Sequence, residues 1–105
     1  MDHALDYGFQ MMQPKEIYAA LEKERAMLID LRSEDEYQKG HLNHARNLPY
    51  SQMGDWSQEI PNGVSLILYC EHGNLSLLAA RKLRGRKGKI YTVNGGYQAI
   101  QKKKD

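Results

Sequence analysis

The most regular hydrophobic pattern in the chain consists of two continuous apolar runs. Residues 26–31 (AMLIDL) and 64–69 (VSLILY) each contain five apolar side chains in six positions. Runs of this length and composition are typical of strands buried on both faces of a sheet. A third segment, KIYTV at 89–93, has the β-branched and aromatic residues that strands favour. The pattern therefore predicts three strands, with a further short extended segment at 45–50 (ARNLPY).

Segments with helical spacing separate these strands. Residues 13–24 (QPKEIYAALEKE) carry proline at an early helical position, followed by apolar side chains three and four residues apart. SEDEYQKG at 33–40 begins with a capping box, Ser33 with Glu36, and ends on Gly40. Two further helices and one weak helix are predicted at 76–85 (SLLAARKLRG), 96–104 (GYQAIQKKK) and 51–59 (SQMGDWSQE).

Strands that alternate with helices predict an α/β fold, with a mostly parallel sheet that helices cover on both faces. The carboxyl ends of parallel strands share one edge of the sheet, and ligands bind beyond that edge. The three predicted strands are followed there by Asp30 with Arg32, by Cys70, and by Asn94. We therefore expect these residues to converge, which places Cys70 where chemistry is expected.

Composition narrows the class of protein without indicating a function. The 105 residues are 41% hydrophobic and 27% charged, which predicts one globular domain over 1–105 with its core at about 12–102. The first ten residues lack the apolar stretch of a secretory signal, and no apolar run could span a membrane. One cysteine forms no internal disulfide, so the expected location is the cytoplasm. Basic residues gather at 81–89 without interleaved aromatic side chains, so nucleic-acid binding is not expected.

Cys70 opens the loop that joins the 64–69 strand to the next helix (CEHGNLS). Such a turn directs unpaired backbone N–H groups and the positive end of the helix dipole at the first loop residues. These surroundings favour the nucleophilic thiolate. Gly73 can adopt a positive φ beside the sulfur, and Ser76 can bind an anion or cap the helix. The alternative interpretation is that Cys70 is a small hydrophobic residue of the core.

Three segments resemble the rhodanese-like sulfurtransferases, in the order that this family has. CEHGN.S is similar to the active-site loop, in which glycine is at the fourth position, and VNGGYQAI to the closing Gly-Gly-aromatic segment. LIDLRSEDEYQKGHLNHARNLP is similar to the upstream signature, carried here by Asp30, Arg32, Glu36, Tyr37, Gly40, His41, Leu42, Ala45, Asn47, Leu48 and Pro49. The resemblance covers about residues 14–100 and is greatest to the single-domain thiosulfate sulfurtransferases.

The resemblance implies a five-stranded, mostly parallel sheet and a two-step reaction without a cofactor. The Cys70 thiolate would take the outer sulfur of thiosulfate or another sulfane-sulfur donor, forming a persulfide. It would then pass that sulfur to cyanide, a thiol or a partner protein. The loop amides would hold the substrate and the persulfide. The residues of this loop are Glu71, His72, Gly73, Asn74, Leu75 and Ser76.

Four signature residues are expected to have mainly structural roles near the site. We expect Arg32 and Glu36 to form an ion pair beside the active edge. Asp30 is expected to accept N–H bonds from the loop or the helix, and His41 to be a hydrogen-bonded packing residue. His72 is the histidine expected to touch a substrate, because it lies in the loop at the mouth of the site.

The loop departs from the family in its charge. Many relatives carry arginine or lysine there, whereas this loop has one carboxylate, Glu71, and no cation. Thiosulfate is therefore expected to be a poor donor unless a distal cation such as Arg81 compensates. Leu75 replaces a hydroxyl or arginine and adds an apolar rim. His44 stands where relatives commonly have a small residue.

Four functions fit these features. The first is a free-standing sulfurtransferase, and the second is a sulfur-relay carrier fed by a cysteine desulfurase, which the acidic loop favours. The third is a non-catalytic interaction module, which the presence of Cys70 disfavours. The fourth is a Cys-x5-Arg phosphatase or arsenate reductase, which needs arginine where Ser76 stands. A metal site is not expected, because His72 and Cys70 have no second Cys/His pair at ligand spacing.

Overall fold

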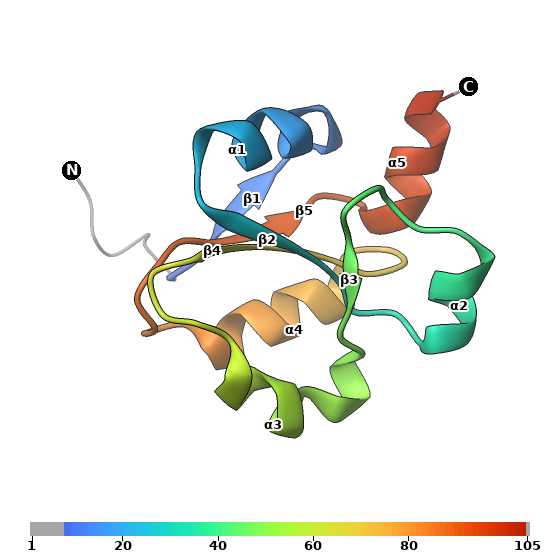
Figure 1. The fold of residues 1–105 in the computed structure, drawn as a ribbon. Coiled ribbons are helices and arrows are strands. Elements are labelled where there is room, and N and C mark those ends of the chain that lie inside the picture. Colours follow the sequence, from blue (N-terminus) through green and yellow to red (C-terminus); the bar gives the residue numbers. More distant parts are fainter. Residues whose placement is uncertain (1–7, 105) are drawn as a thin grey trace.

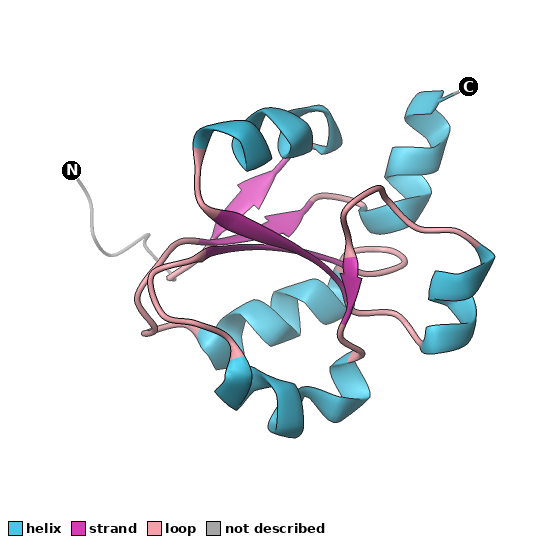
Figure 2. Cartoon of the chain, viewed as in Figure 1, coloured by secondary structure: helices cyan, strands magenta, loops and turns pink. Residues whose placement is uncertain are grey.

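The computed structural model describes residues 8–104 as a five-stranded sheet surrounded by helices (Figures 1 and 2). The strands are β1 (Gln10–Met12), β2 (Ala26–Asp30), β3 (Arg46–Asn47), β4 (Ser65–Tyr69) and β5 (Ile90–Val93). The α-helices are α1 (Ile17–Lys23), α2 (Glu34–Lys39), α3 (Met53–Trp56), α4 (Asn74–Leu83) and α5 (Gly96–Lys104). Short 3-10 helices are η2 (Pro14–Glu16), η3 (Tyr50–Gln52) and η4 (Ser57–Glu59).

All five strands run parallel, in the order β1-β5-β4-β2-β3. This arrangement confirms the expected α/β fold with a parallel five-stranded sheet. The strand pattern in the sequence did not predict β1. Its three residues are too few to show a period, and two of them are exposed at the edge of the sheet.

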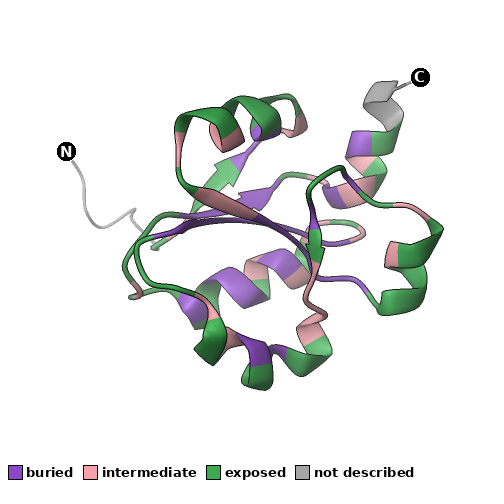
Figure 3. Ribbon diagram, viewed as in Figure 1, coloured by how far each residue is buried: buried purple, intermediate pink, exposed green. Residues whose placement is uncertain are grey.

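Alternate residues of β4 face two separate hydrophobic cores, because successive side chains of a strand point to opposite faces. Leu66 and Leu68 pack with residues of α3 and α4, whereas Ile67 and Tyr69 pack with residues of α1 and α5. Figure 1 shows α3 and α4 on one side of the sheet and α1 and α5 on the other. Strands β4 and β5 are buried throughout (Figure 3). Cys70 belongs to the core on the α3/α4 side.

Local sequence signals set several helix ends. The Ser33 Oγ accepts the Glu36 N–H at 3.3 Å at the start of α2, and α2 ends before Gly40, as predicted. Helix α4 begins two residues earlier than predicted, because Gly73 turns the chain into the helix with φ +103°. The weak helix predicted at 51–59 is divided among η3, α3 and η4.

The structure does not describe residues 1–7 and 105. The expectation that the first ten residues carry no secretory signal therefore falls mostly on residues outside the described chain. Within residues 8–104, no helix is both long enough and apolar enough to cross a membrane.

Candidate active site

The carboxyl ends of β2, β4 and β5 meet at one edge of the sheet, as predicted. Strand β2 pairs with β4 up to the last residue of each strand. On the other side of β4, the first turn of α5 contacts the loop that begins at Cys70. The Tyr97 N–H donates to the Cys70 carbonyl at 2.8 Å, and the Gln98 N–H donates to the Glu71 carbonyl at 3.1 Å. The loop is therefore held between the end of β2 and the start of α5.

Two consecutive glycines allow this close approach of α5. Gly95 and Gly96 have φ values of +78° and +63°, which L side chains rarely adopt. A Cβ on Gly96 would lie 2.8 Å from the carbonyl carbon of Glu71. The Gly-Gly pair of the VNGGYQAI segment is thus explained by the packing of α5 against the loop.

The Cys70 sulfur lies among backbone N–H groups of its own loop. Its Sγ accepts the N–H of Gly73 at 3.1 Å and the N–H of Ser76 at 3.4 Å. The positive φ expected for Gly73 is confirmed. Backbone N–H groups that converge on one atom stabilise negative charge there. The geometry therefore suits a sulfur that becomes anionic.

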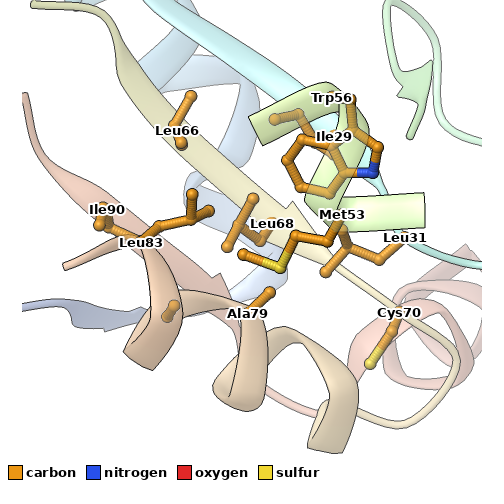
Figure 4. Packing of buried hydrophobic residues seen from close by; sticks show 11 residues of the cluster. Ile29, Leu31, Met53, Trp56, Leu66, Leu68, Cys70, Ala79, Leu83 and Ile90 are labelled. Atoms are coloured by element: carbon orange, nitrogen blue, oxygen red, sulfur yellow. The ribbon is translucent and has the colours of Figure 1, made fainter. Parts of the chain in front are cut away.

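The same cysteine is fully buried. Cys70 has 0% of its surface exposed and lies in the core with Leu31 and Ala79 (Figure 4). Both interpretations of the sequence therefore hold in part: the residue is packed in the core, and its sulfur still receives two loop N–H groups. In this conformation a small molecule reaches the sulfur only if side chains of the loop move.

Ser76 uses its side chain to fix the loop rather than to cap α4 or face an anion. Its Oγ donates to the Gly73 carbonyl at 3.0 Å and lies 2.5 Å from the Thr92 Oγ1. Both hydroxyl groups have 0% exposed surface, so each satisfies the other in the core. Thr92 was not predicted as a site residue, because a threonine within a strand gives no sequence signal of this contact.

Asn74 is the polar side chain closest to the sulfur among the contacts of Cys70. Its Oδ1 lies 3.9 Å from the Sγ, in a geometry that fits donation from the thiol, and it also accepts the Leu75 N–H at 3.0 Å. The protonated thiol thus has one acceptor and two donors. Leu75 itself is half-buried and packs against the α3/α4 core.

Arg32 pairs with Asp30, and the predicted ion pair between Arg32 and Glu36 is wrong. The Arg32 Nη2 lies 2.8 Å from the Asp30 Oδ2, and both side chains are buried. Glu36 is exposed on α2, where it takes part in the cap with Ser33. Burial lowers the pKa of Arg32, but the hydrogen bonds and charge of Asp30 outweigh it and hold that pKa above its ordinary value. The Arg32 side chain instead reaches the end of α2, where its Nη2 donates to the Gly40 carbonyl at 2.6 Å.

Asp30 accepts N–H bonds, although from a different donor than expected. Its Oδ1 accepts the backbone N–H of Arg32 at 2.9 Å and the Arg32 Nε–H at 3.1 Å. Removing either partner of this buried pair would leave an uncompensated charge, at a cost of about 3–5 kcal/mol. The pair therefore fixes the turn between β2 and α2 beside the Cys70 loop.

Glu71 connects the Cys70 loop to Arg32, which follows β2, and to Gln98 of α5. Its Oε1 lies 3.4 Å from the Arg32 Nη1, and its Oε2 accepts from the Gln98 side chain. The Arg32 guanidinium also lies over the Tyr97 ring, 4.0 Å from its centroid. The carboxylate is therefore paired with a cation outside the loop, which the sequence did not indicate because Arg32 and Glu71 lie 39 positions apart.

The histidines of the site region have different surroundings. His41 is hydrogen-bonded, as expected, but it is exposed: its Nδ1 lies 2.8 Å from the Tyr37 carbonyl and its ring stacks on the Tyr37 ring at 3.7 Å. His72 is exposed within the loop. His44 is exposed and has φ +73°, a left-handed backbone conformation.

Neither a metal centre nor a large cavity accounts for this edge. Among the described residues, no group of three or more His, Cys, Asp or Glu side chains is placed to hold a metal ion. A surface hollow of about 460 Å³ lies between β1 and α1, and its lining does not include Cys70. The nucleophilic group described at this edge is the Cys70 thiol, which the N–H groups of Gly73 and Ser76 contact.

Residues 13–103 match the profile of the rhodanese-like domain. The chain belongs to the rhodanese-like domain family. Solved structures agree on the fold: CoADR-RHD of Bacillus anthracis has a TM-score of 0.78 at 28% identity, covering 93% of this chain and 17% of that one. A rhodanese-like domain protein of Staphylococcus aureus has a TM-score of 0.78 at 19% identity, covering 88% of this chain and 91% of that one.

Two curated relatives extend the comparison of this rhodanese-like chain. The uncharacterized protein YqhL of Bacillus subtilis is 38% identical over 76 residues, which are 70% of this chain and 60% of that protein. The thiosulfate sulfurtransferase GlpE of Pseudomonas putida is 29% identical over 91 residues, 86% of this chain and 83% of that protein. Together with the family match, the likeness to GlpE supports a sulfurtransferase activity in general terms.

Proposed function

We propose that this protein is a sulfurtransferase that carries sulfane sulfur as a persulfide on Cys70. The observation that carries the proposal is the sulfur position, where the N–H groups of Gly73 and Ser76 converge on the Sγ. Membership of the rhodanese-like family and the likeness to a thiosulfate sulfurtransferase support the same reaction. The donor is thiosulfate or another sulfane-sulfur compound, and the acceptor is cyanide, a thiol or a partner protein.

The reaction divides into two nucleophilic displacements on sulfur. The Cys70 thiolate attacks the outer sulfur of thiosulfate, the S–S bond of the donor breaks, and sulfite leaves with the electron pair. The product is a persulfide anion on Cys70. An acceptor nucleophile then attacks the outer sulfur, and the Cys70 thiolate leaves. With cyanide the product is thiocyanate, and neither step needs an external oxidant or reductant.

The loop contributes by stabilising charge and by controlling access. Negative charge stays on sulfur throughout, and preorganised N–H groups stabilise such charge without reorganisation. The positive end of α4 acts in the same direction. Because Cys70 is fully buried, the donor enters when side chains around the sulfur shift.

Steady-state transfer to cyanide tests the proposal. We expect the wild type to form thiocyanate from thiosulfate or cysteine persulfide with ping-pong kinetics, because a covalent intermediate separates the two substrates. Cys70→Ser should lose the activity while keeping the fold, which thermal unfolding checks. A wild type that is folded but inactive with both donors would reject the proposal and favour a non-catalytic interaction module.

A sulfur-relay carrier fed by a cysteine desulfurase is the second candidate. It uses the same persulfide on Cys70 but takes the sulfur from a protein rather than from a small anion. The acidic residue in the loop favours it, because Glu71 stands one position after the cysteine. Either role needs a free thiol, so we propose a reducing compartment such as the cytoplasm. Turnover with cysteine persulfide but not with thiosulfate would favour the carrier.

A further inference from the structure

Within the part of the chain that the structure describes, the guanidinium that contacts the Cys70 loop is that of Arg32, and most of its donors are occupied. Arg32 is 5% exposed. Its Nε and Nη2 bind the Asp30 carboxylate, its Nη2 also donates to the Gly40 carbonyl at 2.6 Å, and its Nη1 faces Glu71 at 3.4 Å. These contacts use four of the five N–H groups of Arg32. Its charge is directed at Asp30 and Glu71, which leaves Arg32 little capacity to bind the oxyanions of a small donor.

Glu71 leaves this edge with an excess of negative charge. The linked side chains of Asp30, Arg32 and Glu71 comprise two carboxylates and one guanidinium, so one negative charge is uncompensated. The Glu71 side chain is 29% exposed, which leaves its charge only partly screened by water. The Gln98 amide and the Tyr97 and Tyr69 rings also face these three side chains and carry no formal charge.

We propose that Glu71 determines the class of sulfur donor, favouring donors with at most one negative charge at the reacting end over dianions such as thiosulfate. Persulfides of small thiols or of proteins belong to the favoured class. The inference rests on the proposed function, because it requires that Cys70 accepts sulfur. It adds a residue that selects among donors and that does not itself react.

The size of the effect follows from Coulomb's law. The carboxylate lies one residue from Cys70, within roughly 10 Å of the sulfur by chain geometry. The repulsion is proportional to the charge of the donor and is reduced by the partly aqueous surroundings. Removing the Glu71 charge should raise kcat/KM about tenfold for a dianion and about threefold for a monoanion. The ratio of kcat/KM for a dianionic donor to kcat/KM for a monoanionic donor should then rise about threefold.

Two donors that share one reaction but differ in charge make the test specific. Thiosulfate carries two negative charges, and methanethiosulfonate carries one. In both, the Cys70 thiolate takes the outer sulfur, the S–S bond breaks, and the leaving group, sulfite or methanesulfinate, keeps the electron pair. With cyanide as acceptor, thiocyanate reports turnover for both. We expect E71Q to increase kcat/KM for thiosulfate about threefold more than for methanethiosulfonate.

Two variants separate charge from shape. Glu71→Asp keeps the charge, so its donor ratio should stay near that of the wild type. Glu34→Gln removes an exposed carboxylate from the first turn of α2, outside the linked side chains, and should leave the ratio unchanged. The E71Q effect should also shrink at high salt, because ions screen a partly exposed charge.

The possible failures are distinguishable. An E71Q variant that turns over both donors with the wild-type ratio overturns the inference and leaves the proposed function intact. The same conclusion follows if Glu71→Asp shifts the ratio as much as E71Q, because the shape of the loop would then explain the change. Absence of turnover with either donor, in a folded wild type, rejects both the proposed function and the inference.

Discussion

At the scale of single residues, His44 occupies a backbone conformation that most side chains avoid. It has φ +73° and is exposed between α2 and β3. A left-handed conformation costs a residue with a Cβ about 1–2 kcal/mol, although histidine tolerates it better than most. The backbone of His44 is therefore one that a residue without a Cβ would adopt more easily.

Replacing His44 by glycine should stabilise the fold. The strain is relieved, but glycine loses more entropy on folding, so we expect a net gain of about 0.5–1 kcal/mol. Thermal unfolding should show a melting temperature a few degrees higher. His44→Ala is the matched control, because it keeps the Cβ and should give no gain. Equal stabilisation by both variants would contradict the backbone explanation.

The sequence placed the candidate residues at one edge of the sheet but did not indicate how they contact one another. Cys70 and Gly73 could be placed because a cysteine before a glycine-containing turn constrains the local backbone. The predicted partner of Arg32, Glu36, is wrong, because the sequence does not show which carboxylate is buried with the guanidinium. Burial decides the partner, because a buried guanidinium requires the carboxylate that is buried with it.

At the scale of elements, the amino ends of the strands are held together by a polar contact opposite the active edge. Glu24 follows α1 and accepts hydrogen bonds from Ser65 of β4 at 2.9 Å and from Tyr91 of β5 at 2.8 Å. These hydrogen bonds lower the pKa of Glu24 below its ordinary 4.5. Burial and the same contact raise the pKa of Tyr91 to about 12.

Tyr91→Phe should destabilise the protein in a pH-dependent way. We expect a loss of about 1 kcal/mol near pH 7, where Glu24 is ionised and the hydrogen bond is strongest. Because the folded pKa of Glu24 is lowered, its stabilisation is present above pH 4.5 and is lost as the pH falls through the folded pKa. Urea unfolding should show that Tyr91→Phe loses less free energy of unfolding at about pH 3 than at about pH 7.

Tyr37→Phe provides the control for this pH dependence. The Tyr37 hydroxyl donates to the Ala45 carbonyl at 2.6 Å, and a backbone carbonyl does not titrate. The deficit of Tyr37→Phe should therefore stay the same at both pH values. If the free energy of unfolding lost by Tyr91→Phe is also the same at both pH values, the ionised Glu24 does not hold α1, β4 and β5 together.

The sequence predicted secondary structure best where it contains a long apolar run or a complete capping box. The strands at β2, β4 and β5 and the start of α2 could be predicted from such signals. Strand β1 could not, because Gln10–Met12 is a strand only through its pairing with β5. The early start of α4 at Asn74 depends in the same way on the loop closing around the Cys70 sulfur.

At the scale of the whole molecule, the parallel sheet brings distant segments to the sulfur. Arg32 follows β2, Cys70 follows β4 and Gln98 lies in α5, yet Glu71 connects the first and last of them. Alternation of strands and helices was sufficient to predict this convergence. It could not predict that the thiol would be covered, because burial of Cys70 depends on how the whole loop packs against the α3/α4 core.

The mass of the intact protein tests most directly the claim that Cys70 carries sulfane sulfur. The chain contains one cysteine, so a persulfide needs no mapping. After incubation with cysteine persulfide or thiosulfate, we predict a gain of about 32 Da that cyanide removes and that Cys70→Ser does not show. An unchanged mass with both donors, in a protein that remains folded, would contradict the account.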